Sequence, residues 1–324
     1  MKLDLMIRHG GLFQAPAVVD GVTIEWERKG QPGKMTFSVV KTAALSFSEG
    51  DTVSFAVDGK KMFRGFVFDK ERNGLDKKII KVTCYDQLYY MSKNKDTYVL
   101  ENKTAADVLR MVCEDFGLQF GLIMPTPYLM ESRVADNESL LDITQTALDL
   151  TEEATAMTFT VFDNAGQIML LGDAALTITD AMLDVSTSGD FSYKTSISEE
   201  TYNRIKLVQE KSDSGSRKVF LAQDPAKMAK WGVLQYTEKL DGDENGGQAK
   251  ANALLLQYNK RHRSLSVKNV KGDVRVRGGT ILPVMLGLGD MNLSAMMRVE
   301  QVQHTFRENE HQMTLRLSGG DFVG

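Results

Sequence analysis

The sequence has 324 residues, of which 42% are hydrophobic and 25% charged, a composition typical of globular proteins without long disordered stretches. Its 39 Lys and Arg against 43 Asp and Glu give a net charge of −4, so the basic excess that phosphate recognition requires is missing and no stable nucleic-acid binding is expected. The length suits two or three domains.

Alternating apolar residues predict β-strands in the first part of the chain. Val22, Ile24 and Trp26 alternate with polar neighbours, and the pattern recurs over 35–39 and 53–57. Turn signals such as Asp58–Gly59 separate these segments. Five or six short strands at this spacing predict an antiparallel β-barrel or sandwich over residues 1–92.

Helical signals follow, and they predict a small α+β domain over residues 93–195. Thr104 begins a capping-box pattern before an apolar helical face that ends at Gly117. We expect a second helix to begin near Asn137 or Ser139. A hairpin is predicted around the turn at 163–166.

Strand patterns return in residues 196–324 and predict a C-terminal β-barrel. Strands are expected over 202–210 and 218–222, and Asp224–Pro225 is typical of a helix start. Spaced apolar residues predict an amphipathic helix over 249–260. The polar segments 211–216 and 240–247 are expected to be exposed loops.

Two segments share one order of strands and turns. Residues 50–85 and 278–317 both run from a Gly-containing start through a strand, a turn, a longer strand, a polar turn and a last strand. Few residues are identical between them. The pattern therefore indicates a duplicated β domain, and a coincidence of strands and turns is the open alternative.

The sequence contains no convincing catalytic, cofactor or metal site. The four histidines, His9, His262, His304 and His311, lack metal-ligand spacing, although the last two should lie on the arms of the final hairpin. For this pair we weigh a metal site against surface or interface histidines and favour the latter. The 287–289 Gly-Leu-Gly segment is interpreted as a turn because no third glycine or helix follows it.

Carboxylates and cysteines do not suggest catalysis either. The adjacent pairs Glu152–Glu153 and Glu199–Glu200 have diverging side chains and are expected to be solvated. Cys84 and Cys113 are expected to be free thiols rather than a disulfide. Since no signal peptide or membrane span is evident, we expect the chain to be made and folded in a cytoplasm.

The order of several short segments resembles one protein family. The chain is similar to the XkdQ/YqbQ-like baseplate hub proteins of contractile phage tails, defective prophages and phage-tail-like bacteriocins, which belong to the wider late-control D tail protein group. The resemblance covers nearly the whole chain, and the order of the segments supports it more than any single motif. These segments are 188–193, 196–206, 231–235, 272–279, 302–306 and 311–315.

The resemblance implies an α+β, mainly β fold with two tube-protein-like antiparallel β-barrels and an inserted small α+β domain. It implies a structural, non-enzymatic role without cofactors, in which three copies form a ring between a central spike protein and the hexameric tail tube or tube-initiator protein. A tape-measure protein and the baseplate wedge are further partners that it allows. The chain would be assembled in the bacterial host cytoplasm and end in the baseplate.

Two other functions remain alternatives at this point. A baseplate-associated cell-wall hydrolase would need a cleft with a perturbed acid, and no residues are left over for a fused hydrolase domain. A monomeric ligand-binding β protein would be expected to carry aromatic residues in one groove. The chain has only two tryptophans, Trp26 and Trp231, which weighs against the second alternative.

Overall fold

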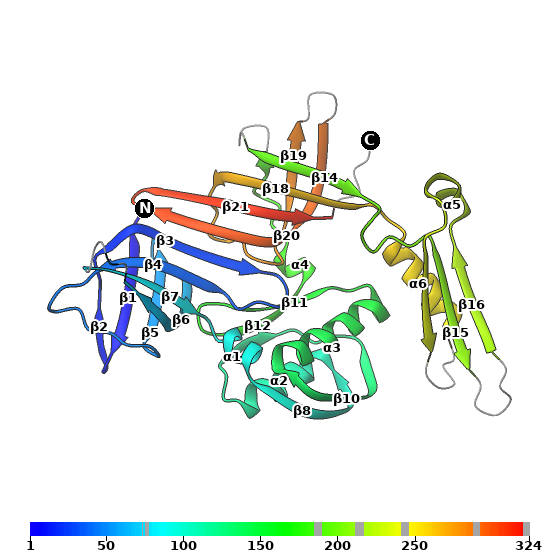
Figure 1. The fold of residues 1–324 in the computed structure, drawn as a ribbon, viewed down its shortest axis with the longest axis horizontal. Helices are drawn as coiled ribbons and strands as arrows, with labels where there is room; N and C mark the ends of the chain where they lie inside the picture. The colour runs from blue at the N-terminus through cyan, green and yellow to red at the C-terminus, as the bar shows by residue number, and fades with distance from the viewer. Residues whose placement is uncertain are drawn as a thin grey trace.

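A computed structural model of the chain describes residues 1–72, 74, 78–184, 190–210, 217–240, 246–287 and 292–319. Their buried apolar side chains form three separate clusters, and the elements around each cluster form the three regions visible in Figure 1. The largest region is a β-sheet built from both ends of the chain. The second is an α+β unit, and the third is a small sheet with a helix at the side of the molecule far from the N-terminus.

The large sheet joins strands that are distant in the sequence. Its order is β14–β18–β21–β20–β3–β4–β7–β6–β5–β1–β2, with β19 beside β20 and β13 beside β19. The pairs along this path are antiparallel, whereas β13 and β19 are parallel. The strands are β1 (Leu3–His9), β2 (Leu12–Gln14), β3 (Val18–Glu27), β4 (Lys34–Val40), β5 (Thr52–Val57), β6 (Lys60–Glu71), β7 (Ile79–Tyr85), β13 (Leu183–Asp184), β14 (Phe191–Ser196), β18 (His262–Lys271), β19 (Ile281–Gly287), β20 (Asn292–Arg307) and β21 (Glu310–Ser318).

The predicted strands over 22–26, 35–39 and 53–57 are confirmed and lie in β3, β4 and β5. Their apolar residues are buried and alternate with partly exposed neighbours, as expected for strands with one face toward a core. Asp58 and Gly59 both have positive φ and join β5 to β6 in a two-residue turn. Local patterning therefore specified these elements.

A unit of four strands occurs twice in this sheet, and we call it the meander because its last three strands in the sequence are consecutive neighbours. The order β4–β7–β6–β5 recurs as β18–β21–β20–β19. In both meanders the long middle strand has one extra residue relative to the strand that follows it in the sequence. This residue is Phe68 in β6, which pairs with β7, and Glu300 in β20, which pairs with β21. Because bulges occupy specific positions in a ladder, this match supports the predicted duplication of residues 50–85 and 278–317.

The two meanders also share a glycine turn at equivalent points. Gly50 and Gly279 have φ of 88° and 90° and donate their N–H groups to the carbonyls of Val67 and Val299, at 2.8 Å in both cases. Each valine donates back to the residue after the glycine, at 2.9 and 2.8 Å. Glycine suits this position since the left-handed backbone disfavours a Cβ atom.

The α+β unit contains two small sheets, β8–β10 and β9–β12–β11. Helices α2 and α3 pack against each other over its core (Figure 1). The elements are α1 (Leu88–Lys93), β8 (Lys95–Thr104), α2 (Ala105–Asp115), β9 (Phe120–Ile123), β10 (Leu129–Ser139), α3 (Leu140–Thr155), β11 (Phe159–Asp163), β12 (Ile168–Gly172) and α4 (Asp173–Leu176).

Capping determines where the two main helices of this unit begin. Thr104 and Asp107 form the predicted capping box at α2, and Gly117 follows its end with φ of 62°. Helix α3 begins after Ser139, whose hydroxyl accepts the N–H of Asp142. The alternative start near Asn137 is wrong, because this residue lies within β10 at a register shift. The predicted hairpin around 163–166 is confirmed as β11 and β12.

The third region is a three-stranded sheet with β15 at its centre, and α6 packs on one face. Asp224 caps α5 as predicted, and the predicted helix at 249–260 begins and ends two residues earlier. The predicted loops at 211–216 and, for the most part, 240–247 lie outside the described residues, as does most of the turn at 287–289. The elements are β15 (Arg204–Glu210), β16 (Arg217–Gln223), α5 (Pro225–Trp231), β17 (Gln235–Leu240) and α6 (Gly247–Tyr258).

The α+β, mainly β class is confirmed, with 53% strand and 19% helix among the residues that the structure describes. Closure of the strands into two barrels stays a prediction, and so does the division into domains 1–92, 93–195 and 196–324. Packing separates the last of these segments into two parts. Residues 205–254 contribute to one core, whereas β18 to β21 share the core of the N-terminal strands.

Candidate functional site

His304 and His311 are the predicted histidines that the structure brings together. His304 Nδ1 lies 2.8 Å from His311 Nε2, and His304 Nε2 lies 2.9 Å from the carbonyl of Val276. A carbonyl can only accept, so Nε2 of His304 donates to it and Nδ1 accepts from His311 in the neutral pair. Burial lowers the pKa of His304 to about 3 and that of His311 to about 4, which keeps both rings uncharged near neutral pH.

The expectation of surface or interface histidines is wrong for His304, which is fully buried. It points into the large core together with Val302 and Phe306, because alternate residues of β20 face the same side. The pair is a buried hydrogen-bonded contact between β20 and β21. In the described parts of the chain, no group of three or more His, Cys, Asp or Glu side chains is placed to hold a metal ion.

The other residues considered in the sequence remain apart. Glu199 pairs with Lys194 at 2.5 Å, and Glu152 lies 3.8 Å from Lys29, so each of these carboxylates lies beside a lysine. The two cysteines are free and buried, as predicted for thiols. Burial raises the pKa of Cys113 to about 12 and that of Cys84 further, which leaves neither as a reactive thiolate.

A buried acidic pair lies where the large sheet meets the α+β unit. Asp86 Oδ2 accepts the N–H of Gly33 at 2.9 Å, and its Oδ1 accepts the N–H of Leu88 at 3.0 Å. Asp163 accepts the N–H of Gly166 at 2.6 Å and the side-chain amide of Gln87 at 3.1 Å. These bonds connect the end of β7, the end of β11 and the loop before β4.

A cation lies beside this acidic pair. The guanidinium of Arg277 lies 4.3 Å from the centre of the Phe162 ring and 5.0 Å from that of Trp26, and it donates to the carbonyl of Asp163 at 3.3 Å. Burial raises the pKa of both carboxyl groups, and the charge of Asp163 raises that of Asp86 further. The positive charge of Arg277 lowers both pKa values and so offsets part of the cost of burying the two carboxylates.

A perturbed carboxyl pair is also what an acid–base catalyst would need, so access to the pair decides its role. The cavity beside Asp86, Asp163 and Arg277 measures about 10 Å³, which leaves room for one water at most. The carboxylate oxygens are already occupied by donors from the chain. The cluster therefore holds the two regions together and offers no space for a substrate.

Sequence reasoning missed this cluster, because Asp86 and Asp163 look like ordinary polar residues after strands. The approach of Gly33 gives the clearest signal. A Cβ atom there would lie 2.3 Å from Asp86 Oδ2 and 2.7 Å from Trp26. Such a signal becomes visible only when the partner that approaches the glycine is known.

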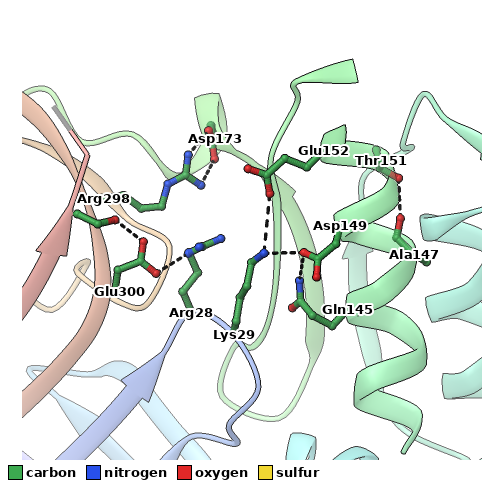
Figure 2. A network of polar contacts seen from close by, with 11 residues as sticks. Arg28, Lys29, Gln145, Ala147, Asp149, Thr151, Glu152, Asp173, Arg298 and Glu300 are labelled. Atoms are coloured by element: carbon green, nitrogen blue, oxygen red, sulfur yellow. Dashed lines mark hydrogen bonds and ion pairs between the residues drawn. The ribbon is translucent and has the colours of Figure 1, made fainter. Parts of the chain in front are cut away.

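A second polar junction joins the same two regions (Figure 2). Arg28 pairs with Glu300 at 2.8 Å, and Lys29 reaches Asp149 of α3 at 2.5 Å. Arg298 of β20 holds both carboxylate oxygens of Asp173, at 2.8 and 2.6 Å. Residues from β20, α3, α4 and the loop that follows β3 therefore form ion pairs in one part of the molecule, which fixes the α+β unit against the large sheet.

Exposed apolar side chains mark the surfaces that could contact other proteins. Leu12 and Phe13 are 71% and 66% exposed on β2, the edge strand of the large sheet. Val219 and Leu221 lie exposed on β16. A groove of about 870 Å³ runs beside His311. Among the described residues, no helix has both the length and the apolar character needed to cross a membrane.

Comparison with known proteins identifies relatives over nearly the full length. The chain is 28% identical over 305 residues to the uncharacterized protein YqbQ of Bacillus subtilis, covering 92% of this chain and 91% of that protein. It is 29% identical over 308 residues to XkdQ of the phage-like element PBSX in the same organism, with the same coverage.

A solved structure has a similar fold at low identity. The 43 kDa tail protein of prophage MuSo2 from Shewanella oneidensis matches with a TM-score of 0.69 at 11% identity, covering 97% of this chain and 98% of that one. A family model described as YQBQ-like matches residues 22–318. The chain therefore has the fold of a phage tail protein and belongs to the YQBQ-like family.

Proposed function

We propose that this chain is a structural protein of a phage tail or tail-like particle. Within that particle, three copies form a baseplate hub that connects the central spike to the hexameric tail tube. Membership of the YQBQ-like family and the tail-protein fold support the general role. The finer role rests on the duplicated meander.

The duplication supports the hub because it offers a way to match two symmetries. One chain carries the strand order β4–β7–β6–β5 twice, each time with a bulge in the middle strand. Three chains then present six similar β units. A ring of this kind can meet a three-fold spike on one side and a six-fold tube on the other.

The proposed partners follow from this geometry. They are two further copies of the chain, the central spike protein, and the tail tube or tube-initiator protein, with the tape-measure protein and the baseplate wedge as additional neighbours. The exposed Leu12 and Phe13 on edge strand β2 suit a contact between chains, since obligate interfaces have apolar centres and edge strands accept further strands. Assembly would take place in the bacterial host cytoplasm.

Neither alternative has an observation of equal weight. A hydrolase needs an accessible acid, and the buried pair Asp86 and Asp163 has space for one water at most. A ligand-binding protein could use the groove beside His311, which is lined by apolar core residues such as Met313 and Leu315. Among the described residues, its lining also includes Asp58, Asp184, Lys271 and Asp273, and this mixture of charges points to no particular ligand.

A structure within the assembled particle tests the proposal. We expect a three-fold ring of this chain between spike and tube, in which the two meanders of each chain superpose. A ring of different symmetry, or halves that do not superpose, would refute the hub role. A monomer in solution is compatible with the proposal if the spike closes the ring. Zymography on peptidoglycan with the purified chain should give no cleared band, and a cleared band would favour the hydrolase.

A further inference from the structure

The two meanders of the chain join where β3 pairs with β20, and we call this contact the internal joint. β3 lies beside β4 in the first meander, and its other edge pairs antiparallel with β20 beyond the bulge at Glu300. In register, Glu25 lies opposite Gln303, and their side chains share a hydrogen bond of 2.8 Å. At the end of the joint, the N–H of Arg28 donates to the carbonyl of Glu300 at 2.9 Å.

β14 occupies the position in the second meander that β3 occupies in the first. β3 pairs antiparallel with β4, and β14 pairs antiparallel with β18, the strand equivalent to β4. The registers of β4 on β7 and of β18 on β21 make Glu25 equivalent to Lys194 and Arg28 equivalent to Ile197. Among the described strands, β14 pairs only with β18, so its other edge ends the sheet.

The end of β6 corresponds to the part of β20 that β3 covers. Phe68 and Glu300 are the equivalent bulges, which makes Glu71 equivalent to Gln303. Pairing of β6 with β5 ends at Phe66, and no described strand lies beside the rest of β6 on that side. One chain therefore has both edges of a second joint. Six strands lie between β14 and β6 in the sheet, and the two do not pair within one copy (Figure 1).

The first position of the internal joint holds an ion pair that changes character as a unit. Arg28 and Glu300 pair at 2.8 Å, with side chains 16% and 23% exposed. The equivalent residues are Ile197 and Phe68, which are both apolar and partly buried. A replacement of only one member would leave a charge opposite an apolar side chain. The joint change is expected if Ile197 and Phe68 also face each other.

A second position combines opposite charges. Lys194 and Glu71 take the places of the hydrogen-bonded side chains of the internal joint. Within its own copy, Lys194 lies 2.5 Å from Glu199, and Glu71 lies 3.8 Å from Lys81. All four side chains are more than half exposed, so these pairs contribute little and leave room for a cross-strand partner. The charges are therefore compatible with a second joint, whereas the strand register selects it.

We propose that β14 of one copy pairs antiparallel with residues 68–71 of a second copy, in the register of the internal joint. Ile197 then lies beside Phe68, and Lys194 lies opposite Glu71. Internal joints and joints between copies alternate, which continues the sheet from chain to chain. Closure with three copies rests on the function proposed above, whereas the pairing rests on the register of the repeat.

Disulfide cross-linking in purified particles tests this pairing. Glu71→Cys and Lys194→Cys in one chain would place two cysteines opposite each other across two copies, at a distance that a disulfide can span. Oxidation should convert most of the chain into covalent species of two and three copies on a non-reducing gel. The matched control is Lys81→Cys with Lys194→Cys, which should stay monomeric because β7 lies one strand further away. The native Cys84 and Cys113 are buried and should add no background.

The outcomes separate this pairing from the proposed function. A chain that is present in particles but stays monomeric after oxidation would refute the pairing alone. Equal cross-linking of the control pair, or cross-linking only to a different protein, would also refute it. Absence of the wild-type chain from particles would refute the proposed function, and oxidation of the concentrated free chain would then decide the pairing.

Charge exchange provides a second test, in which each variant replaces the wild-type chain. Glu71→Lys alone and Lys194→Glu alone place like charges opposite each other, and each should reduce incorporation into particles by about threefold or more. The double variant restores opposite charges and should recover incorporation, which a folding defect would not do. Thermal melts of the free variants check their folding. A double variant that incorporates as poorly as the single variants would contradict the proposed register.

Discussion

Arg277 lies with its guanidinium carbon 4.3 Å from the centre of the Phe162 ring, and this contact joins the large sheet to the α+β unit. On its other side the same side chain faces Trp26, and the carboxyl groups of Asp86 and Asp163 lie nearby. The cluster places a cation between two aromatic rings and beside two buried acids. Its removal should therefore affect stability through charge as well as packing.

Replacement of Arg277 by Met should destabilise the chain by about 3–5 kcal/mol at pH 7, because buried carboxylates would lose their cation. The loss should be smaller at pH 5. The folded-state pKa of these carboxyls is raised, and it would rise further without Arg277, so the contribution of these two groups to the stability of the variant becomes more favourable as pH falls. Urea unfolding of the variant and the wild-type chain at pH 7 and pH 5 measures the two losses of stability. Exposed Arg275→Met is the control and should cost less than about 1 kcal/mol.

Substitution of the two equivalent glycines should have unequal effects. Gly50→Ala should cost about 1–2 kcal/mol, because the left-handed backbone disfavours a Cβ atom while the space around it is open. Gly279→Ala should cost more, since the new Cβ would also lie 2.8 Å from the Thr160 side chain. Unfolding free energies of both variants test this. Equal losses would mean that the Thr160 contact relaxes freely.

The histidine pair should make stability depend on pH. The folded-state pKa values of His304 and His311 are lowered to about 3 and about 4, whereas an unfolded histidine has a pKa of about 6.5. The unfolded chain therefore binds more protons below pH 6.5, and stability falls as pH drops from there toward 4. His311→Gln retains a donor for His304 and should reduce this slope by about 1.4 kcal/mol per pH unit. An unchanged slope would contradict the buried neutral pair.

The junction ion pair Arg298–Asp173 should contribute more than an exposed pair at similar distance. Its side chains are 20% and 34% exposed and form two hydrogen bonds. In a double-mutant cycle to alanine we expect a coupling energy of about 1 kcal/mol. The reference pair Lys194–Glu199, with both side chains more than half exposed, should couple by less than about 0.5 kcal/mol. Equal coupling in the two cycles would argue against a specific role for the junction.

Local signals accounted for much of the fold. Thr104 and Asp224 cap helices as predicted, since a cap depends on residues three positions apart. The order of turns in the sequence also indicated the repeat. The structure then made it possible to compare the equivalent turns at Gly50 and Gly279. The family resemblance, carried by segments such as 302–306, gave the class of protein, and the YQBQ-like match agrees with it.

Contacts between distant segments could not be read in the same way. Nothing local indicates that β3 pairs with β20, or that Asp86 and Asp163 approach Arg277. His304 was expected at a surface because the register of β20 relative to the core was unknown, and a shift of one residue would have exposed it. The missed features all depend on which strand lies beside which.

The pairing of β3 with β20 also determines when the chain can complete its fold during synthesis. The side chain of Gln303 donates to Glu25 at 2.8 Å across 278 residues of sequence. At about 5–20 residues per second, β3 is made on the order of tens of seconds before the strand that covers its free edge. A nascent chain therefore exposes this edge for most of its translation, and early termination upstream of β20 would leave a permanent site for aggregation.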